Sequence, residues 1–428
     1  MGILAWNNLQ LLPICTCYST GNMNTELTPE SDFVQLADRM SRLPAYVFGE
    51  INRIKYGKRR EGVDIIDMAM GNPTDPTPQN IVDKLCEVVQ DPRNHRYSEA
   101  SGIYNLRREI SRFYKRRYDV SLDPEKEVIT TIGSKEGFSH LCLALIGAGD
   151  TVLVPAPSYP IHSYGVTMAG GRCIYLPIQD DEEFLRQVDQ ACRGDLPRPK
   201  LLFINYPHNP TAHVVTLEFF AEIVKLARRH HLIVVHDFAY GGISFDGYRP
   251  PSFLEVPGAK EVGVEFTSMS KTFNMAGWRI GFCSGNPRIV DGLARVKGYY
   301  DYGVFQAIQI ASIVALRDYE NISKQQSAIY QERRDTLVRS LHQGGWNDFQ
   351  TPQAGMFIWS AVPANIEKIG SMEFSVRMMN DGQVAIAPGI AFGKQGEGHV
   401  RLALIEQKQR ILQGARQIRR TLQRWKSS

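Results

Sequence analysis

Short apolar runs alternate with helical patterns between residues 128 and 300, and this alternation constrains the fold more than any other feature. The runs are rich in β-branched residues and lie at 127–130, 151–156, 173–178, 200–205, 232–237 and 264–269. Such an alternation is typical of an α/β fold with a mostly parallel central sheet flanked by helices. Ligands of these sheets bind beyond the carboxyl ends of the strands, so the residues after each run are the functional candidates.

The C-terminal third has a different pattern. A long helical stretch at about 305–342 is followed by strand-like pieces at 356–362, 384–389 and 399–404 and by helical patterns at 372–380 and 407–425. This mixture indicates a smaller α+β domain. We expect an N-terminal extension (1–31), an arm with part of the small domain (32–70), a large ligand-binding domain (71–304), and a connecting helix with the C-terminal small domain (305–428).

Composition and charge exclude several classes of protein. Hydrophobic residues make up 43% of the 428 residues and the net charge is +4, with the basic residues scattered, so we expect no nucleic-acid partner. No run approaches the ~18 apolar residues that a membrane span needs. The seven cysteines are an odd number in a long chain and suit the reduced, mostly buried cysteines of a cytoplasmic protein. Cys15 and Cys17 have no second cysteine pair and no nearby histidine pair, so we expect no metal site there.

The first 22 residues are moderately apolar but lack a basic start and a clean cleavage site for a signal peptide. Met23 begins a polar leader, MNTELTPESDF, that suits the start of a cytoplasmic chain. We expect residues 1–22 to be disordered or not translated.

Polar side chains follow two of the predicted strands. Asp237 ends the run LIVVHD, with Tyr240 three residues later, and Asn209-Pro210 follows the run KLLFIN. A carboxylate at the end of a buried strand needs a partner, which a helix cap, an ion pair or a cationic ligand ring would each provide. Asn-Pro alone is a common turn.

A lysine follows another strand, in the stretch SMSKTFNMAGWRIGF. Lysine becomes a nucleophile when burial or nearby cations lower its pKa, and Lys271 is followed by Arg279. A lysine linked to pyridoxal phosphate also needs an acid for the ring nitrogen, a phosphate cup and a ring for stacking. Asp237, the GSKEG turn at 133–137 and Tyr159 supply these parts, although such a turn is also an ordinary strand–helix connection.

The segments SMSKTFNMAGWRIGF, NYPHNPTA, VVHDFAY and GEGHVRLAL together resemble the class I/II pyridoxal-phosphate aminotransferases of fold type I. The resemblance runs from about Asp32 to Trp425 and is closest to the bacterial alanine (glutamate–pyruvate) aminotransferase subgroup. It implies a large domain with a mostly parallel sheet, a smaller α+β domain and a homodimer with shared active sites.

The resemblance also implies roles for residues at the cofactor. Lys271 would hold the cofactor aldehyde covalently and move the substrate α-proton, Asp237 would keep the ring nitrogen protonated, and Asn209 and Tyr240 would bind the ring 3-oxygen. Tyr159 would stack on the ring. The phosphate ligands would be Ser134, Lys135, Ser268 and Arg279, together with Tyr97 reaching the phosphate of the partner subunit.

At the substrate, the resemblance implies that Arg401 pairs with the α-carboxylate, near Asn209 and the backbone of Gly71. The reaction would be a ping-pong transfer from L-alanine to 2-oxoglutarate, with small-molecule amino and oxo acids as partners and no metal. Aspartate, LL-diaminopimelate or methionine and aromatic amino acids are alternative donors, and a lyase or a cofactor-binding regulator are alternative functions. His208, expected to be a loop residue near the cofactor, and Glu99 depart from the subgroup pattern and leave the preferred substrate open.

Overall fold

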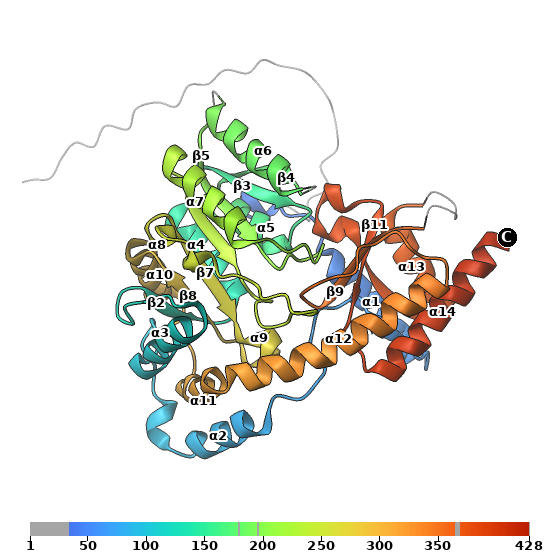
Figure 1. The fold of residues 1–428 in the computed structure, drawn as a ribbon, viewed down its shortest axis with the longest axis horizontal. Coiled ribbons are helices and arrows are strands. Elements are labelled where there is room, and N and C mark those ends of the chain that lie inside the picture. Colours follow the sequence, from blue (N-terminus) through green and yellow to red (C-terminus); the bar gives the residue numbers. More distant parts are fainter. Residues whose placement is uncertain (1–33, 179, 195–196, 364–368, 428) are drawn as a thin grey trace, which may run out of the picture.

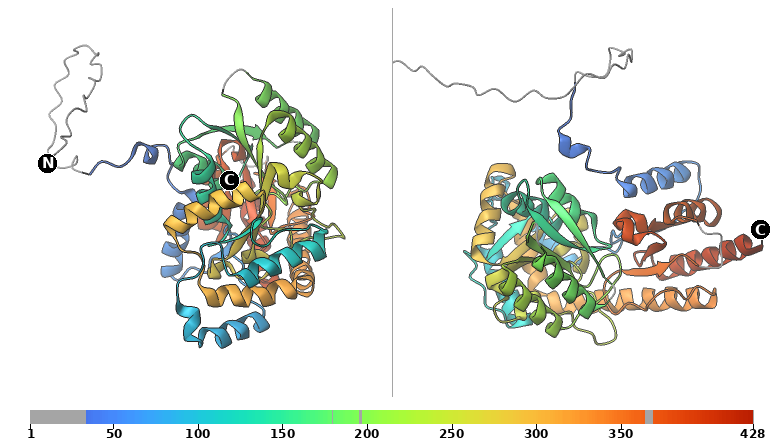
Figure 2. Two further views of the ribbon diagram at one scale, coloured as in Figure 1. Left: turned by 90° about the vertical axis from the view of Figure 1, so that its left-hand side faces the viewer. Right: turned by 90° about the horizontal axis from the view of Figure 1, so that it is seen from above.

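The computed structural model describes residues 34–178, 180–194, 197–363 and 369–427, which form two β-sheets with their helices (Figures 1 and 2). The whole predicted extension at 1–31, with Cys15, Cys17 and Met23, lies outside these residues, as do 32 and 33. Within the described ranges, no helix has both the length and the apolar character to cross a membrane.

The larger sheet has seven strands in the order β2-β8-β7-β6-β5-β3-β4. Its strands are β2 (Val128–Thr131), β3 (Thr151–Ala156), β4 (Arg172–Pro177), β5 (Pro199–Asn205), β6 (Ile233–Asp237), β7 (Gly263–Ser268) and β8 (Gly281–Gly285). The six predicted runs are all strands. The prediction of a mostly parallel sheet is confirmed, because six of the seven strands run in one direction and β8 runs in the opposite one. β8 itself was not predicted.

Helices cover both faces of this sheet (Figure 2). Alternate side chains of β5 pack on opposite sides: Leu201 and Phe203 lie in one buried cluster, Leu202 and Ile204 in another. The first cluster contains residues of α4 (Ser134–Leu145), α5 (Pro160–Met168) and α10 (Pro287–Tyr300). The second contains residues of α2 (Gln79–Val89), α3 (Tyr104–Tyr118), α6 (Asp181–Arg193), α7 (Leu217–His230) and α11 (Gln306–Arg317).

The smaller sheet has the order β1-β10-β11-β9 and joins segments far apart in the chain. It contains β1 (Ile66–Met68), β9 (Phe357–Ala361), β10 (Val384–Pro388) and β11 (His399–Ala403). In the sequence, β1 precedes every strand of the larger sheet, and it pairs in parallel with β10. The chain leaves the smaller sheet after β1. Around it lie α1 (Val47–Arg60), α13 (Ser371–Gly382) and α14 (Lys408–Ser427).

The predicted helical stretch at 305–342 is two helices, because α11 ends at Arg317 and α12 (Tyr319–Gln343) begins after Asp318. α12 runs alongside both sheets (Figure 1). Its first residue packs on Phe113 of the large layer, whereas Tyr330 and Leu337 belong to the core of the smaller sheet. Shorter elements are α8 (Ala259–Val262), α9 (Met269–Thr272) and the 3₁₀ helices Asp38–Met40, Pro92–His95, Phe253–Glu255, Ala276–Trp278, Gly389–Phe392 and Lys394–Gly396.

Candidate active site

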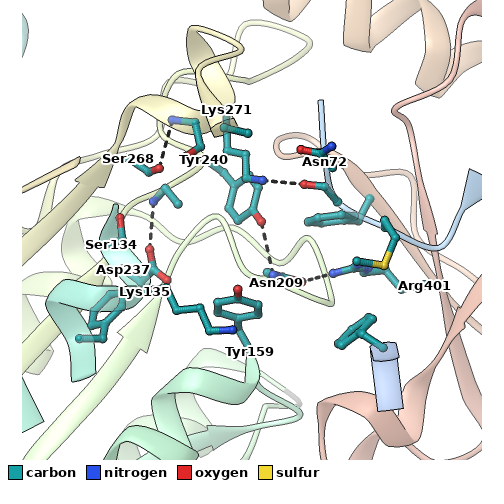
Figure 3. A pocket seen from close by; sticks show the side chains of 18 of the residues that line it. Asn72, Ser134, Lys135, Tyr159, Asn209, Asp237, Tyr240, Ser268, Lys271 and Arg401 are labelled. Atoms are coloured by element: carbon teal, nitrogen blue, oxygen red, sulfur yellow. Dashed lines mark hydrogen bonds between the residues drawn. The ribbon is translucent and has the colours of Figure 1, made fainter. Parts of the chain in front are cut away.

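A cavity of about 270 Å³ opens at the carboxyl ends of the parallel strands, between the two sheets (Figure 3). All but one of the predicted site residues line it: Gly71, Ser134, Lys135, Tyr159, Asn209, Asp237, Tyr240, Ser268, Lys271, Arg279 and Arg401. The exception is Tyr97, which is 89% exposed and lies beside Tyr302, outside the cavity of its own chain. The chain thus brings these side chains together from both sheets.

Asp237 ends β6 at the floor of the cavity, where its carboxylate accepts hydrogen bonds on both oxygens. The Ala239 N–H donates to Oδ1 (3.2 Å), and His162 Nε2 lies 3.0 Å from Oδ2. His162 is fully buried and stacks on Phe203. His162 was not among the residues predicted from the sequence, although it lies three residues after Tyr159 on the helix that begins at Pro160.

Lys271 lies on the short helix α9, just after β7. Its Nζ donates a hydrogen bond to the Gly71 carbonyl (2.6 Å). Burial, followed by the positive charges of Arg401 and Arg279, lowers the pKa of Lys271 from 10.5 to about 8, with the charge of Asp237 opposing. A larger share of this lysine is therefore neutral, and nucleophilic, near neutral pH than of a lysine in solvent.

This pKa predicts how the cofactor-free protein reacts with pyridoxal phosphate. The coupling rate should rise with pH around a midpoint near 8, because the neutral amine attacks and the protonated one does not. Replacing Arg401 by leucine should move the midpoint upward, since a like charge disfavours the protonated lysine. Stopped-flow absorbance between about pH 6 and pH 10 measures both midpoints. A wild-type midpoint near 10.5 would contradict the prediction.

Asn209 connects the two halves of the cavity. Its Nδ2 donates to the Tyr240 hydroxyl (3.3 Å), and its Oδ1 accepts from Arg401 Nη1 (2.8 Å). Arg401 Nη2 donates to the Ala69 carbonyl (2.8 Å), whereas its buried Nε has no hydrogen-bond partner among the described residues. Burial raises the pKa of the Tyr240 hydroxyl, against the opposing charge of Arg401. Arg401 therefore keeps N–H groups available for an acceptor that enters the cavity.

Three phenylalanine rings surround the Arg401 guanidinium. Its Cζ lies 4.0 Å from the ring centre of Phe357, 4.7 Å from Phe392 and 5.7 Å from Phe48. This burial lowers the pKa of Arg401 to about 10. We call these three rings the Arg401 cage. A Cβ at Gly71 would lie 2.9 Å from the Phe357 ring, so glycine lets the backbone pass close to this cage. The sequence analysis did not predict these rings as site residues.

The opposite end of the cavity suits an anion. Ser134 begins α4, where the first N–H groups have no helical acceptor, and its buried Oγ finds no partner in the described part of the chain. Gly133 has φ of +73°, and a Cβ there would lie 2.4 Å from the Arg279 guanidinium. Ser268 Oγ accepts the Ser270 N–H (3.1 Å) and keeps its own hydrogen to donate.

Lys135 extends from the first turn of α4 toward Tyr159 (Figure 3). Its Nζ lies 5.4 Å from the ring centre of Tyr46, just before α1, which the sequence analysis did not single out. Burial, followed by the charge of Arg279, lowers the pKa of Lys135. Burial also raises the pKa of Tyr159 to about 12, so this phenol is neutral.

These groups fit the expected pyridoxal phosphate. The α4 N-terminus, the unpartnered Ser134 hydroxyl and Arg279 form a cradle for a phosphate. Asp237 offers a carboxylate to a ring nitrogen, and Lys271 offers an amine of lowered pKa. The hydrogen-bond donors of the cradle suit the anionic phosphate of this cofactor. The Asp237 carboxylate at the floor of the cavity suits its protonated ring nitrogen.

His208 and Glu99, which depart from the family pattern, lie outside the cavity lining. His208 is buried, and its Nδ1 lies 2.7 Å from Thr211 Oγ1 in its own loop. Burial lowers its pKa well below the usual value, which keeps the ring neutral. Glu99 accepts a hydrogen bond from Arg107 (3.3 Å). Both contacts hold loops in place.

Comparison with known proteins gives the same answer as the geometry. A family model described as aminotransferase class I and II matches residues 63–413. The glutamate–pyruvate aminotransferase AlaC of Escherichia coli (strain K12) is 49% identical over 381 residues, which cover 89% of this chain and 92% of the relative. An LL-diaminopimelate aminotransferase of Moorella thermoacetica is 42% identical over 389 residues, covering 91% and 99%.

The substrate-bound structure of BacF from Bacillus subtilis superposes with a TM-score of 0.83 at 33% identity, covering 91% of this chain and 98% of BacF. Sequence, fold and cavity agree. The chain therefore belongs to the class I and II aminotransferases of fold type I, enzymes that use pyridoxal phosphate to transfer amino groups between amino and oxo acids.

Proposed function

We propose that this aminotransferase transfers the amino group of L-alanine to 2-oxoglutarate. The observation that carries the proposal is the cage around Arg401. Among the described residues, the cavity lining has two arginines, and Arg279 lies at the anion end. Arg401 alone thus faces the substrate from this chain, so it grips one carboxylate, while Phe48 and Phe357 favour a small apolar side chain. The E. coli relative is named for glutamate and pyruvate, the two products of this reaction, and so supports the proposal.

In this proposal Arg401 binds the substrate α-carboxylate. A planar guanidinium suits a carboxylate because it donates two parallel hydrogen bonds, which a lysine cannot do. Asn209 accepts a hydrogen bond from the Arg401 guanidinium and donates one to the Tyr240 hydroxyl. It thereby fixes the substrate-binding arginine relative to the tyrosine expected beside the cofactor ring. The backbone of Gly71 leaves room for the carboxylate beside Phe357.

Lys271 takes the α-proton and later returns it. Its lowered pKa keeps a useful fraction of the amine neutral near pH 8, where a general base of this kind works best. When bound, pyridoxal phosphate supplies an electron sink for the charge left on the substrate α-carbon. Asp237 would face the ring nitrogen and favour its protonated form, and His162 fixes the orientation of the carboxylate. The phosphate would be held by Ser134, Lys135, Ser268 and Arg279, and Tyr159 would stack on the ring.

The same proposal makes the enzyme a homodimer with shared sites. Tyr97 and Tyr302 lie in ring contact, and Tyr97, Tyr299, Tyr300 and Tyr302 are all more than half exposed, which is a costly aromatic surface for a monomer. In a dimer, Tyr97 would reach the phosphate of the partner subunit. Analytical ultracentrifugation at micromolar concentration tests this arrangement, and a purely monomeric protein would contradict it.

LL-diaminopimelate is the second candidate donor, favoured by the 42% identity to the Moorella enzyme. Its distal ammonium and carboxylate would need partners beyond Arg401. Within the described lining of one chain, Asn72 and Lys135 are polar groups that could approach them.

A single-turnover experiment separates the candidates. The purified holoenzyme is mixed with one amino acid at a time, without an oxo acid, and the loss of the lysine-linked cofactor absorbance is followed. L-Alanine should react fastest among the candidate donors, because one carboxylate and a compact side chain fit Arg401 and its phenylalanine rings. L-Glutamate should also react, because it is the amino acid that the proposed reaction forms. A faster reaction with LL-diaminopimelate than with L-alanine would identify LL-diaminopimelate as the donor. The absence of a reaction with any amino acid would contradict the proposal.

A further inference from the structure

A buried ion pair lies behind the substrate end of the cavity. Lys55 of α1 is 2% exposed, and its Nζ donates to Oδ2 of Asp67 in β1. Removing both charges from water is costly, and such pairs often contribute no more stability than apolar side chains of the same size. Stability alone therefore does not account for this pair.

The other oxygen of Asp67 holds the turn that follows β1. Oδ1 accepts the N–H groups of Ala69 (3.0 Å) and Met70 (3.3 Å), and the N–H of Asp67 donates to Glu406 Oε1 (3.2 Å). A carboxylate that accepts from the backbone two and three residues ahead fixes the local chain direction. Lys55 in turn limits the rotation of that carboxylate.

Two carbonyl groups of this turn accept hydrogen bonds from Arg401 and Lys271, the side chains that the proposed function gives to substrate binding and proton transfer. The Ala69 carbonyl accepts from Arg401 Nη2 (2.8 Å), and the Gly71 carbonyl accepts from Lys271 Nζ (2.6 Å). The latter bond is drawn beside Asn72 in Figure 3. A shift of this short turn would therefore move acceptors of both cations.

Arg401 has few directional contacts of its own. The three phenylalanine rings restrict its plane, but among the described residues the hydrogen bonds that orient its N–H groups go to Asn209 Oδ1 and to the Ala69 carbonyl. Both acceptors are neutral, so neither competes strongly with an incoming carboxylate. Loss of the Ala69 acceptor would leave Asn209 as the remaining directional contact, and small misplacements of binding groups reduce rates and affinities strongly.

We propose that Asp67, held by Lys55, is a positioning residue that orients Arg401 for the substrate α-carboxylate through the turn at Ala69. The inference rests on the role given to Arg401 in the proposed function. It makes Asp67 responsible for the affinity of ligands that carry an α-carboxylate, while the chemistry at Lys271 depends on it less.

Two double variants test this with matched stability. Lys55→Met/Asp67→Asn and Lys55→Met/Asp67→Leu both remove the ion pair without leaving a buried charge unpaired, but the asparagine keeps an acceptor oxygen for the turn. The probe is 2-methylalanine, which has a carboxylate and an amine but no α-proton, titrated calorimetrically into the holoenzyme. L-Alaninamide, which lacks the carboxylate, is the control ligand.

The leucine double variant should bind 2-methylalanine about tenfold more weakly than the asparagine one and show a similar rise in KM, corresponding to loss of roughly one hydrogen bond. The asparagine variant should bind 2-methylalanine with an affinity between those of the wild type and the leucine variant, because it keeps an acceptor for the turn but loses the contact with Lys55. Alaninamide should bind both variants alike. Equal affinity of the two variants for 2-methylalanine would overturn the inference, as would equal loss for alaninamide. Alanine turnover by the wild type tests the proposed function separately, because the binding comparison needs only a carboxylate ligand.

Discussion

Lys271→Ala should reduce turnover by at least roughly 10⁴-fold, because the variant loses both the covalent link to the cofactor and the base that moves the α-proton. The absorption band of the lysine-linked cofactor should disappear, while the cofactor should still bind through the cradle at Ser134 and Arg279. Steady-state kinetics and the absorption spectrum of the purified variant measure these effects.

Lys135→Ala is the matched control, since it removes a second cavity lysine that has its own lowered pKa. This variant should keep the absorption band and lose mainly cofactor affinity. Near-normal transamination by Lys271→Ala, or loss of the band in Lys135→Ala, would show that the amine roles are assigned to the wrong residue.

Asp237→Asn should lower kcat by about 10³-fold, the scale on which a preorganised electrostatic group acts. The amide has the shape of the carboxylate and can still accept from His162, so packing should survive. It cannot, however, stabilise a proton on the ring nitrogen, and the cofactor becomes a poorer electron sink. Kinetics together with the absorption spectrum of the bound cofactor measure the change.

Asp246→Asn is the corresponding control, because Asp246 pairs with Arg334 outside the cavity lining. It should affect thermal stability and leave kcat within about twofold of wild type, as expected of a partly exposed ion pair. A kcat for Asp237→Asn as high as that of this control would remove Asp237 from the reaction.

The sequence predicted the parts of the fold and site that are local. The strands of the larger sheet were recognisable because their residues are apolar on both faces, as Leu201 to Ile204 show. Asp237, Ser268 and Lys271 were recognisable because each lies at or just after the carboxyl end of such a strand, and parallel strands carry these ends to one edge.

What the sequence did not reveal depends on contacts between distant segments. β8 reads GFCSG, with two glycines and no β-branched residue, and is a strand because β7 and β2 both pair with it. The helix break at Asp318 carries neither glycine nor proline. The cage of Arg401 needs α1 and the 3₁₀ helix at Gly389–Phe392 to meet, and the bond from His162 to Asp237 spans 75 residues.

The reversed direction of β8 has a consequence for which changes in chain length the protein tolerates. Because β7 and β8 pair at Ser268 and Gly281, the chain between them leaves the sheet and returns at fixed points. Lys271 and Arg279 both lie in this connection between β7 and β8. The register of the two strands therefore sets the distance between the two side chains. Substitutions in 272–278 can be absorbed by repacking, but one inserted or deleted residue would change the reach between the amine and the phosphate ligand. In this stretch the number of residues is constrained more tightly than their identity.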